Sequence, residues 1–229
     1  MPRRACVLAA MVALSWLLRT AAAHAEPRRP AELFVDLGFG NAVCDNKKPD
    51  SDCPVDGAGT FGFGGAWRFH PNWAVGGELG IWAFKVKDAW RGQLQGQNPA
   101  TDVKLSSVFI APLARWYWDP GGIADPYLQA GVGLGAVTAK ASNAGGTYDA
   151  QATGVVFPVG IGVDWYLSRY FRLGPQALAY LQYTSKVCET TNGDKTCHGP
   201  SSDNNALPWR IAVVGTFVIG GRSETAASR

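Results

Sequence analysis

Histidine is scarce in this chain, and histidine is the side chain on which most enzymatic acid–base chemistry depends. Three are present among 229 residues, and His24 lies in the export segment described below, so His70 and His198 remain. These two fall in different predicted connections between strands, and the loop around His198 is rich in Gly, Pro and Asn and offers no scaffold for catalytic geometry. The sequence therefore predicts no catalytic residues and no enzymatic activity.

Long apolar runs are also missing, apart from one at the beginning of the chain. Residues 5–18 are apolar, Arg3 and Arg4 precede them, and the small-x-small sequence Ala-His-Ala follows at 23–25. This order is typical of a secretory signal peptide, and the run is shorter than the roughly 20 residues that a transmembrane helix needs. We predict that residues 1–25 are a cleaved signal peptide, with an uncleaved anchor as the alternative.

An excess of positive charge disappears once this segment is set aside. The whole chain has 21 Lys and Arg against 18 Asp and Glu, and the segment holds three of the arginines and none of the acids. The rest of the chain is therefore balanced in charge. We predict no nucleic-acid partner, because the basic footprint of such a protein is absent.

Pairs of the CxxC type, which mark four-thiolate metal sites, are absent. Beyond the signal segment the cysteines are Cys44, Cys53, Cys188 and Cys197, an even number in an exported chain, where disulfides persist. Each pair is separated by nine residues, which favours the disulfides Cys44–Cys53 and Cys188–Cys197; cross-linking between the two loops is the alternative. The aspartates around Cys53 do not match a calcium-binding loop, so we predict no metal and no cofactor.

What the chain has in place of these features is a period of two. In the stretch DPYLQAGVGLGAVT at 125–138, Leu128, Val132 and Leu134 fall on one face, and the opposite face is mostly glycine. Strands alternate in this way, and several glycines on one face indicate crowding or sharp curvature, as on the inside of a small closed barrel. The alternation predicts that Val132→Arg harms assembly more than Gly133→Ser.

Similar patterns predict eight strands, whose connections alternate between long and short. The long connections cover about 41–57, 87–101, 139–152 and 186–206. This alternation is typical of a barrel with short turns at one end and long loops at the other. We predict an all-β fold, an eight-stranded antiparallel up-and-down transmembrane β-barrel over 26–220, followed by a short polar tail at 221–229. The strands are expected at about 32–40, 58–69, 73–86, 102–118, 126–138, 153–167, 171–185 and 207–219.

Aromatic residues gather around the three short turns. Aromatic side chains with a polar edge settle at the boundary between membrane and water, whereas core aromatics of a soluble barrel would be scattered along the strands. We therefore predict an aromatic girdle at the short-turn end. Its members are Trp67, Phe69, Trp73, Trp116, Trp118, Tyr127, Trp165, Tyr170 and Phe171.

Charged residues fall on the strand faces opposite the apolar ones. Alternation alone allows either face to be the inside, so a soluble lipocalin-like carrier is an alternative. The signal peptide, the clustered aromatics and the glycines on the polar side favour a polar lumen inside an apolar belt, in which opposite charges pair. The predicted lumenal charge cluster consists of Asp36, Arg68, Glu78, Arg115, Asp164 and Arg172.

The hairpins AWRFHPNWAVGGELG, LARWYWDPGGIADPYLQAGVGLG and VDWYLSRYFRLGPQAL share an aromatic–short turn–aromatic pattern. With them the chain resembles the small eight-stranded outer-membrane barrels of the OmpA-like, OmpX-like and OmpW-like kind. The resemblance implies an outer-membrane location, long extracellular loops, short periplasmic turns, contact with lipid and lipopolysaccharide, and recognition by the barrel-assembly machinery. Such barrels usually end on an aromatic residue, whereas here Phe217 is followed by a further stretch, VIGGRSETAASR.

These expectations converge on a non-enzymatic protein with a structural or surface-interaction role. A narrow passive pore for small solutes is the first alternative, and a lipid-modifying barrel enzyme is a weaker one. The extracellular ligand of the long loops is not identified by the sequence.

Overall fold

The structure, a computed structural model, describes residues 31–44, 55–87, 102–118, 123–143, 146–168, 170–199 and 206–219. The predicted signal peptide at 1–25, the tail at 221–229 and Cys53 lie outside these residues, so the pairing Cys44–Cys53 does as well. The described part of the chain contains no helix that is long and apolar enough to cross a membrane.

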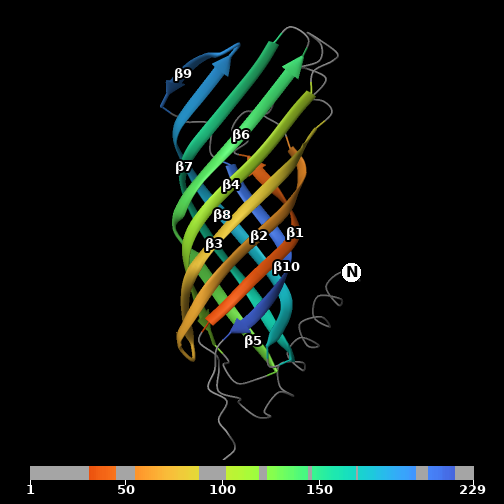
Figure 1. Cartoon of the computed structure of the whole chain (residues 1–229), viewed down its shortest axis with the longest axis vertical. Coiled ribbons are helices and arrows are strands. Elements are labelled where there is room, and N and C mark those ends of the chain that lie inside the picture. Colours follow the sequence, from red (N-terminus) through yellow and green to blue (C-terminus); the bar gives the residue numbers. More distant parts are fainter. Residues whose placement is uncertain are drawn as a thin grey trace, which may run out of the picture.

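Ten strands make up the described structure (Figure 1). They are β1 (Ala31–Cys44), β2 (Val55–His70), β3 (Trp73–Val86), β4 (Asp102–Tyr117), β5 (Ala124–Gly131), β6 (Gly133–Asn143), β7 (Gly146–Ser168), β8 (Phe171–Thr191), β9 (Asp194–His198) and β10 (Ala206–Ile219).

The strands close into a ring with eight antiparallel positions. We call each position a stave; seven staves are single strands and one consists of two consecutive strands. β1 to β4 pair in sequence, and β5 and β6 together form the fifth stave, because each pairs with β4 on one side and with β7 on the other. β7 pairs with β8, β8 with β10, and β10 returns to β1 in a register from Ala31–Ile219 to Cys44–Ala206. The predicted eight-stranded antiparallel barrel is confirmed, and closure of the ring pairs each stave on both sides.

The two ends of the barrel differ. The short turns β2–β3, β4–β5 and β7–β8 lie at one end, here called the turn end, together with Ala31 and Ile219; the other end is the hairpin end. There β6 and β7 stay paired as far as Asn143–Gly146, so the expected long loop at 139–152 is wrong. The expected loop at 186–206 is also partly wrong, because β8 continues to Thr191 and β9 folds back onto it. These strands rise above the ring in Figure 1.

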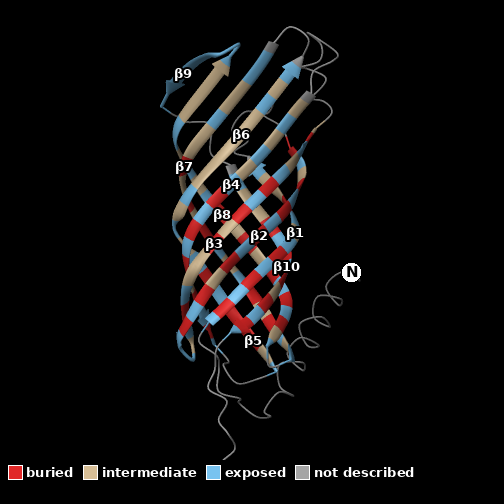
Figure 2. Ribbon diagram, viewed as in Figure 1, coloured by how far each residue is buried: buried red, intermediate tan, exposed pale blue. Residues whose placement is uncertain are grey.

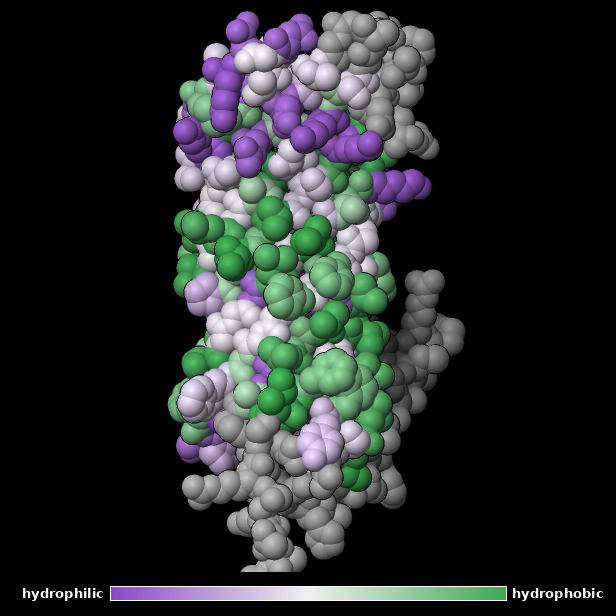
Figure 3. Space-filling view, in the orientation of Figure 1, coloured by the Kyte–Doolittle hydropathy of each residue, from purple (hydrophilic) through white to green (hydrophobic). Residues whose placement is uncertain are grey.

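Side chains alternate between the lumen and the outside. On β1, for example, Phe34 and Asp36 are buried while Leu33, Val35 and Leu37 are exposed. The same alternation gives the chequered wall of Figure 2 and the apolar outer belt of Figure 3, above which polar side chains gather at the hairpin end. Strands of about 9–11 residues cross a bilayer, and every one of the eight staves is at least that long. A polar interior inside an apolar belt is the pattern of a transmembrane barrel.

Close packing explains several of the glycines on the lumenal face. A Cβ added to Gly62 would lie 2.2 Å from Oδ2 of Asp36, and one added to Gly162 would lie 2.3 Å from the ring of Tyr127. Both positions face large lumenal side chains that any substituent would displace. Glycine is therefore required where a neighbouring side chain reaches across the wall.

Candidate functional site: the barrel lumen

A group of five charged side chains fills the lumen near the turn end; we call it the lower network and define it as Glu32, Arg68, Asp125, Asp164 and Arg172. Arg68 donates through Nη1 to Asp125 Oδ2 at 2.9 Å, and its Nε lies 3.1 Å from Glu32 Oε1. Arg172 lies within salt-bridge distance of Glu32, Asp125 and Asp164. All five residues are buried, and buried charges persist when they are paired in this way.

A second group, the upper network, lies one step closer to the hairpin end and consists of Asp36, Glu78, Gln129, Gln176 and Arg210. Arg210 Nη1 lies 2.8 Å from Asp36 Oδ1, and Arg210 also pairs with Glu78. Gln129 donates to Glu78 Oε2 at 2.9 Å, and Gln176 donates to Gln129 Oε1 at 3.1 Å. The upper network therefore connects strands from opposite parts of the ring.

Aromatic rings and Arg115 join the two networks. Tyr117 donates from its hydroxyl to Glu32, and the guanidinium of Arg68 lies 3.6 Å from the centroid of its ring. Arg115 donates to Gln129 and lies over the rings of Phe34 and Tyr127. Cation–π contacts of this kind stabilise a cation that has been removed from water. The two networks and these rings are therefore in contact with each other inside the barrel.

The six charges predicted for the lumen all lie there and are buried. Sequence reasoning left out Glu32, Asp125 and Arg210, which the structure adds to the same networks. Glu32 lies on the same face of β1 as Asp36, and Arg210 lies opposite the apolar face of β10. The alternation of faces could therefore have identified both residues as lumenal. Asp125 was harder to find because the expected strand began one residue after it, at 126.

The upper half of the lumen is apolar. A cavity of about 120 Å³ lies there, which we call the lumenal cup. Every stave of the ring contributes to its lining, which is possible only for a site inside the barrel. The lining residues are Ala42, Val55, Trp82, Phe84, Leu105, Ser107, Phe109, Gly135, Val137, Val156, Tyr180, Gln182 and Pro208.

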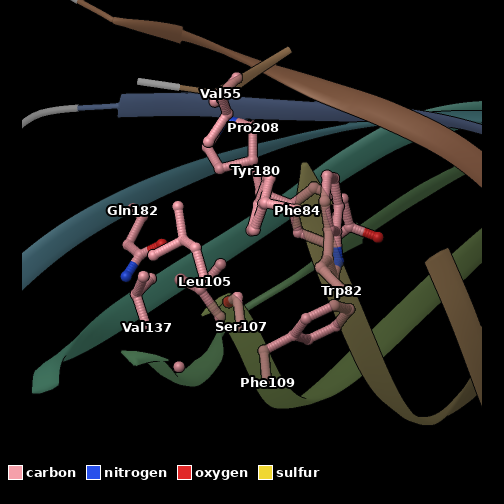
Figure 4. Close-up of a pocket in the computed structure, with 13 residues that line it drawn as sticks. Val55, Trp82, Phe84, Leu105, Ser107, Phe109, Val137, Tyr180, Gln182 and Pro208 are labelled. Atoms are coloured by element: carbon pink, nitrogen blue, oxygen red, sulfur yellow. The ribbon is translucent and has the colours of Figure 1, made fainter. Parts of the chain in front are cut away.

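Three aromatic residues on the side of the upper network form a floor between the cup and the charges. Tyr180 packs edge-on against Trp82, with ring centroids 5.2 Å apart, and lies 4.8 Å from Phe109. The guanidinium of Arg210 lies 5.7 Å from the ring of Tyr180 on the charged side. The labelled side chains of Figure 4 surround a common space, with Trp82 and Phe84 on one side and Val137 and Gln182 on the other.

The expected aromatic girdle contains one wrong member, Tyr127. Its side chain is buried in the lumen, where it packs against Tyr117 and accepts a hydrogen bond from Gln176. The period of two puts Tyr127 on the same face as Gln129, so its proximity to a turn was misleading. Exposed aromatic residues do surround the turn end, and Phe171 packs on Phe217. The exposed members are Trp67, Phe69, Trp73, Trp116, Trp118, Trp165 and Tyr170.

At the hairpin end β8 and β9 are joined by the disulfide Cys188–Cys197, as the spacing predicted. The turn between them contains Asn192 and Gly193, both with positive φ, as a two-residue hairpin turn of type I′ requires. Nearby on β7, burial and the carboxylate of Glu189 raise the pKa of Tyr148.

The two histidines lie at opposite ends of the barrel. His70 ends β2 at the turn end, and His198 ends β9, where its Nε2 lies 3.7 Å from Glu189 Oε1. Within the described ranges no group of His, Cys, Asp and Glu side chains is arranged to hold a metal ion.

No protein-family model matches the chain, and no curated protein matches its sequence. Solved structures do. Neisserial surface protein A aligns with a TM-score of 0.53 at 14% identity, over 82% of this chain and 97% of its own. A major outer membrane protein from Thermus thermophilus gives 0.54 at 11%, over 82% and 99%. The outer membrane protein OprG from Pseudomonas aeruginosa gives 0.50 at 15%, over 85% and 98%. The chain therefore has the fold of the small outer-membrane β-barrels.

Proposed function

We propose that this protein is a non-enzymatic outer-membrane barrel with a closed lumen, which acts as a structural or surface-interaction protein. The observation that carries the proposal is the pair of lumenal networks, which together with Arg115 place four arginines and five carboxylates inside the wall. In a barrel of eight strands the interior is just wide enough to be filled by side chains. Charges that are bonded to each other across such an interior close it to solutes.

The apolar belt supports the outer-membrane part of this proposal. Large apolar side chains such as Leu37, Phe39, Leu134 and Ile161 are more than half exposed, and they lie on several different staves of the ring. Exposed apolar surface of this extent requires a partner, and in a closed barrel with a polar interior that partner is lipid. Outer-membrane lipid and lipopolysaccharide would then surround the wall, and the barrel-assembly machinery would insert it.

The hairpin end supports the surface-interaction part. β8, β9 and the ends of β6 and β7 extend beyond the ring, and polar side chains gather at this end (Figures 1 and 3). Lys140, Lys186 and Lys195 belong to these strands. The turn end, by contrast, has short connections. In the proposed orientation the hairpin end faces the extracellular medium and the turn end faces the periplasm, as in barrels of this kind.

Conductance in planar bilayers tests the closed lumen against the passive pore. We expect the wild-type protein to give no steady current steps. Arg172→Ala and Arg210→Ala should each remain silent, because each leaves one network in place. The double variant should give cation-selective steps, since both networks then lose an arginine and the carboxylates outnumber the remaining cations.

Folding of each variant is checked by heat-modifiable migration on a gel, and current is recorded only from the folded band. Steady steps from the wild-type protein would favour the narrow pore instead. Formation of modified lipid A by the wild-type barrel in purified outer membranes would favour the lipid-modifying enzyme. Full solubility without detergent would favour a soluble carrier.

A further inference from the structure

The lumenal cup has no part in the proposed function, which rests on the networks below it. It is separated from those charges by the floor of Trp82, Phe109 and Tyr180. No Lys, Arg, Asp or Glu side chain is among its lining residues. The lining residues that carry a polar side-chain atom are Trp82, Ser107, Tyr180 and Gln182.

The size and lining of the cup match a small apolar molecule. Its volume is about 120 Å³, and a protein cavity of roughly 150 Å³ lined by apolar side chains stays dry and binds benzene. Trp82, Phe84 and Phe109 provide ring faces and edges on one side, and such surfaces attract aromatic rings in offset or edge-on geometry. We propose that the cup is a binding site for an uncharged single-ring aromatic molecule or an apolar molecule of similar size.

Gly135 indicates that the cup is not simply filled to the density of a packed core. A Cβ added there would have its nearest neighbour, Cβ of Phe109, at 3.6 Å, which is ordinary contact. Its backbone φ is not in the left-handed region, so an added Cβ would fit at this position without strain. Cores normally fill such space, because a void loses the contacts that its lining could make.

The architecture also sets how a ligand enters and leaves. The networks below the floor close the lumen on the turn-end side, so the ligand must use the hairpin end or pass between strands there. The cup is therefore a dead-end site and not a channel. A charged ligand is excluded, because the lining offers no opposite charge to replace its lost water.

Fluorine NMR with fluorobenzene tests the inference on the refolded protein in detergent micelles. The probe partitions into micelles in every sample, so the signal of interest is a saturable component with one site per barrel. We expect this component for the wild-type protein. Gly135→Phe, which fills the cup, should weaken binding at least tenfold, whereas Leu134→Phe, which adds the same ring to the outer face of β6, should leave the affinity within twofold.

Two further measurements keep the outcomes decisive. If Gly135→Phe does not give the heat-modifiable band, Val137→Trp fills the cup from two residues along the same strand. The anion 4-fluorobenzoate should show no saturable component. The inference is overturned if fluorobenzene shows no saturable component with the wild-type protein, or if the cup-filling variant that folds keeps wild-type affinity. Saturable binding of the anion would overturn the assigned ligand class.

Discussion

A single lumenal arginine illustrates how much one residue can decide in an interior this narrow. Arg172 lies at the centre of the lower network, between Glu32, Asp125 and Asp164, and its own side chain is almost completely buried. Its guanidinium also lies 5.3 Å from the ring of Tyr166. Removing it would leave three buried carboxylates with fewer cations to balance them.

We expect Arg172→Ala to lower the free energy of unfolding by about 3–5 kcal/mol, the usual cost of breaking a buried ion pair from one side. Lys140→Ala is the matched control, because Lys140 pairs with Asp149 at 3.3 Å in an exposed position, where such a pair contributes about 0–1 kcal/mol. Urea titration of each variant in lipid vesicles, with the folded fraction read from the heat-modifiable band, measures both losses of stability. Equal losses in the two variants would show that the lower network does not stabilise the barrel.

The neighbours Leu134 and Gly135 separate the two faces of the wall. Leu134→Arg should reduce the folded fraction strongly, because a lipid-facing arginine near the middle of the membrane costs about 2–4 kcal/mol. Gly135→Ser should be tolerated, since the added atoms enter the lumenal cup. Folded fraction in detergent and vesicles is the measurement, and equal tolerance would argue for a soluble barrel.

Gly133 is not a suitable partner for this comparison, although the sequence predicted that serine would be tolerated there. It does face the lumen, but a Cβ at this position would lie 2.1 Å from the backbone oxygen of Ile110. The sequence shows which face a glycine occupies, whereas the space beside it depends on the neighbouring strand.

Elements show the same division between what the sequence specifies and what it leaves open. The strand pattern and the faces followed from the period of two, because alternation is a property of each strand alone. The partners within the lumen did not, since Arg210 meets Asp36 and Glu78 only after β10 closes against β1. The hairpin of β8 and β9 could have been predicted, because Asn192-Gly193 is a strong hairpin signal.

The disulfide in that hairpin stabilises only its own element. We expect the double variant Cys188→Ser/Cys197→Ser to keep the folded barrel, while amide hydrogen exchange becomes faster in β9 and in the end of β8. A closed loop of this length contributes at most about 3 kcal/mol through chain entropy, and among the described strands β9 pairs with β8 alone. Exchange mass spectrometry resolves the two regions, and loss of the folded band on substitution would contradict a local role.

At the scale of the whole molecule, the outer face and the lumenal face of the barrel wall differ in composition. The outer belt exposes large apolar side chains that need no specific polar contacts, whereas the lumenal charges depend on particular partners. Within the lumen the turn-end half is charged and the hairpin-end half is apolar. The proposed closed lumen depends on the first half, and the inferred ligand site depends on the second.

Because β1 and β10 pair with each other along their whole length, the ring of strands has no structural beginning or end. Ala31 and Ile219 are paired neighbours at the turn end, so a short Gly/Ser linker can join them. Reopening the chain in the turn at 71–72 gives a circular permutant with every strand pair intact, and we expect it to show the same heat-modifiable band. A permutant opened between Gly76 and Gly77, inside β3, should fail, because it divides a stave. The order of the strands along the gene is then one of several that encode the same closed wall.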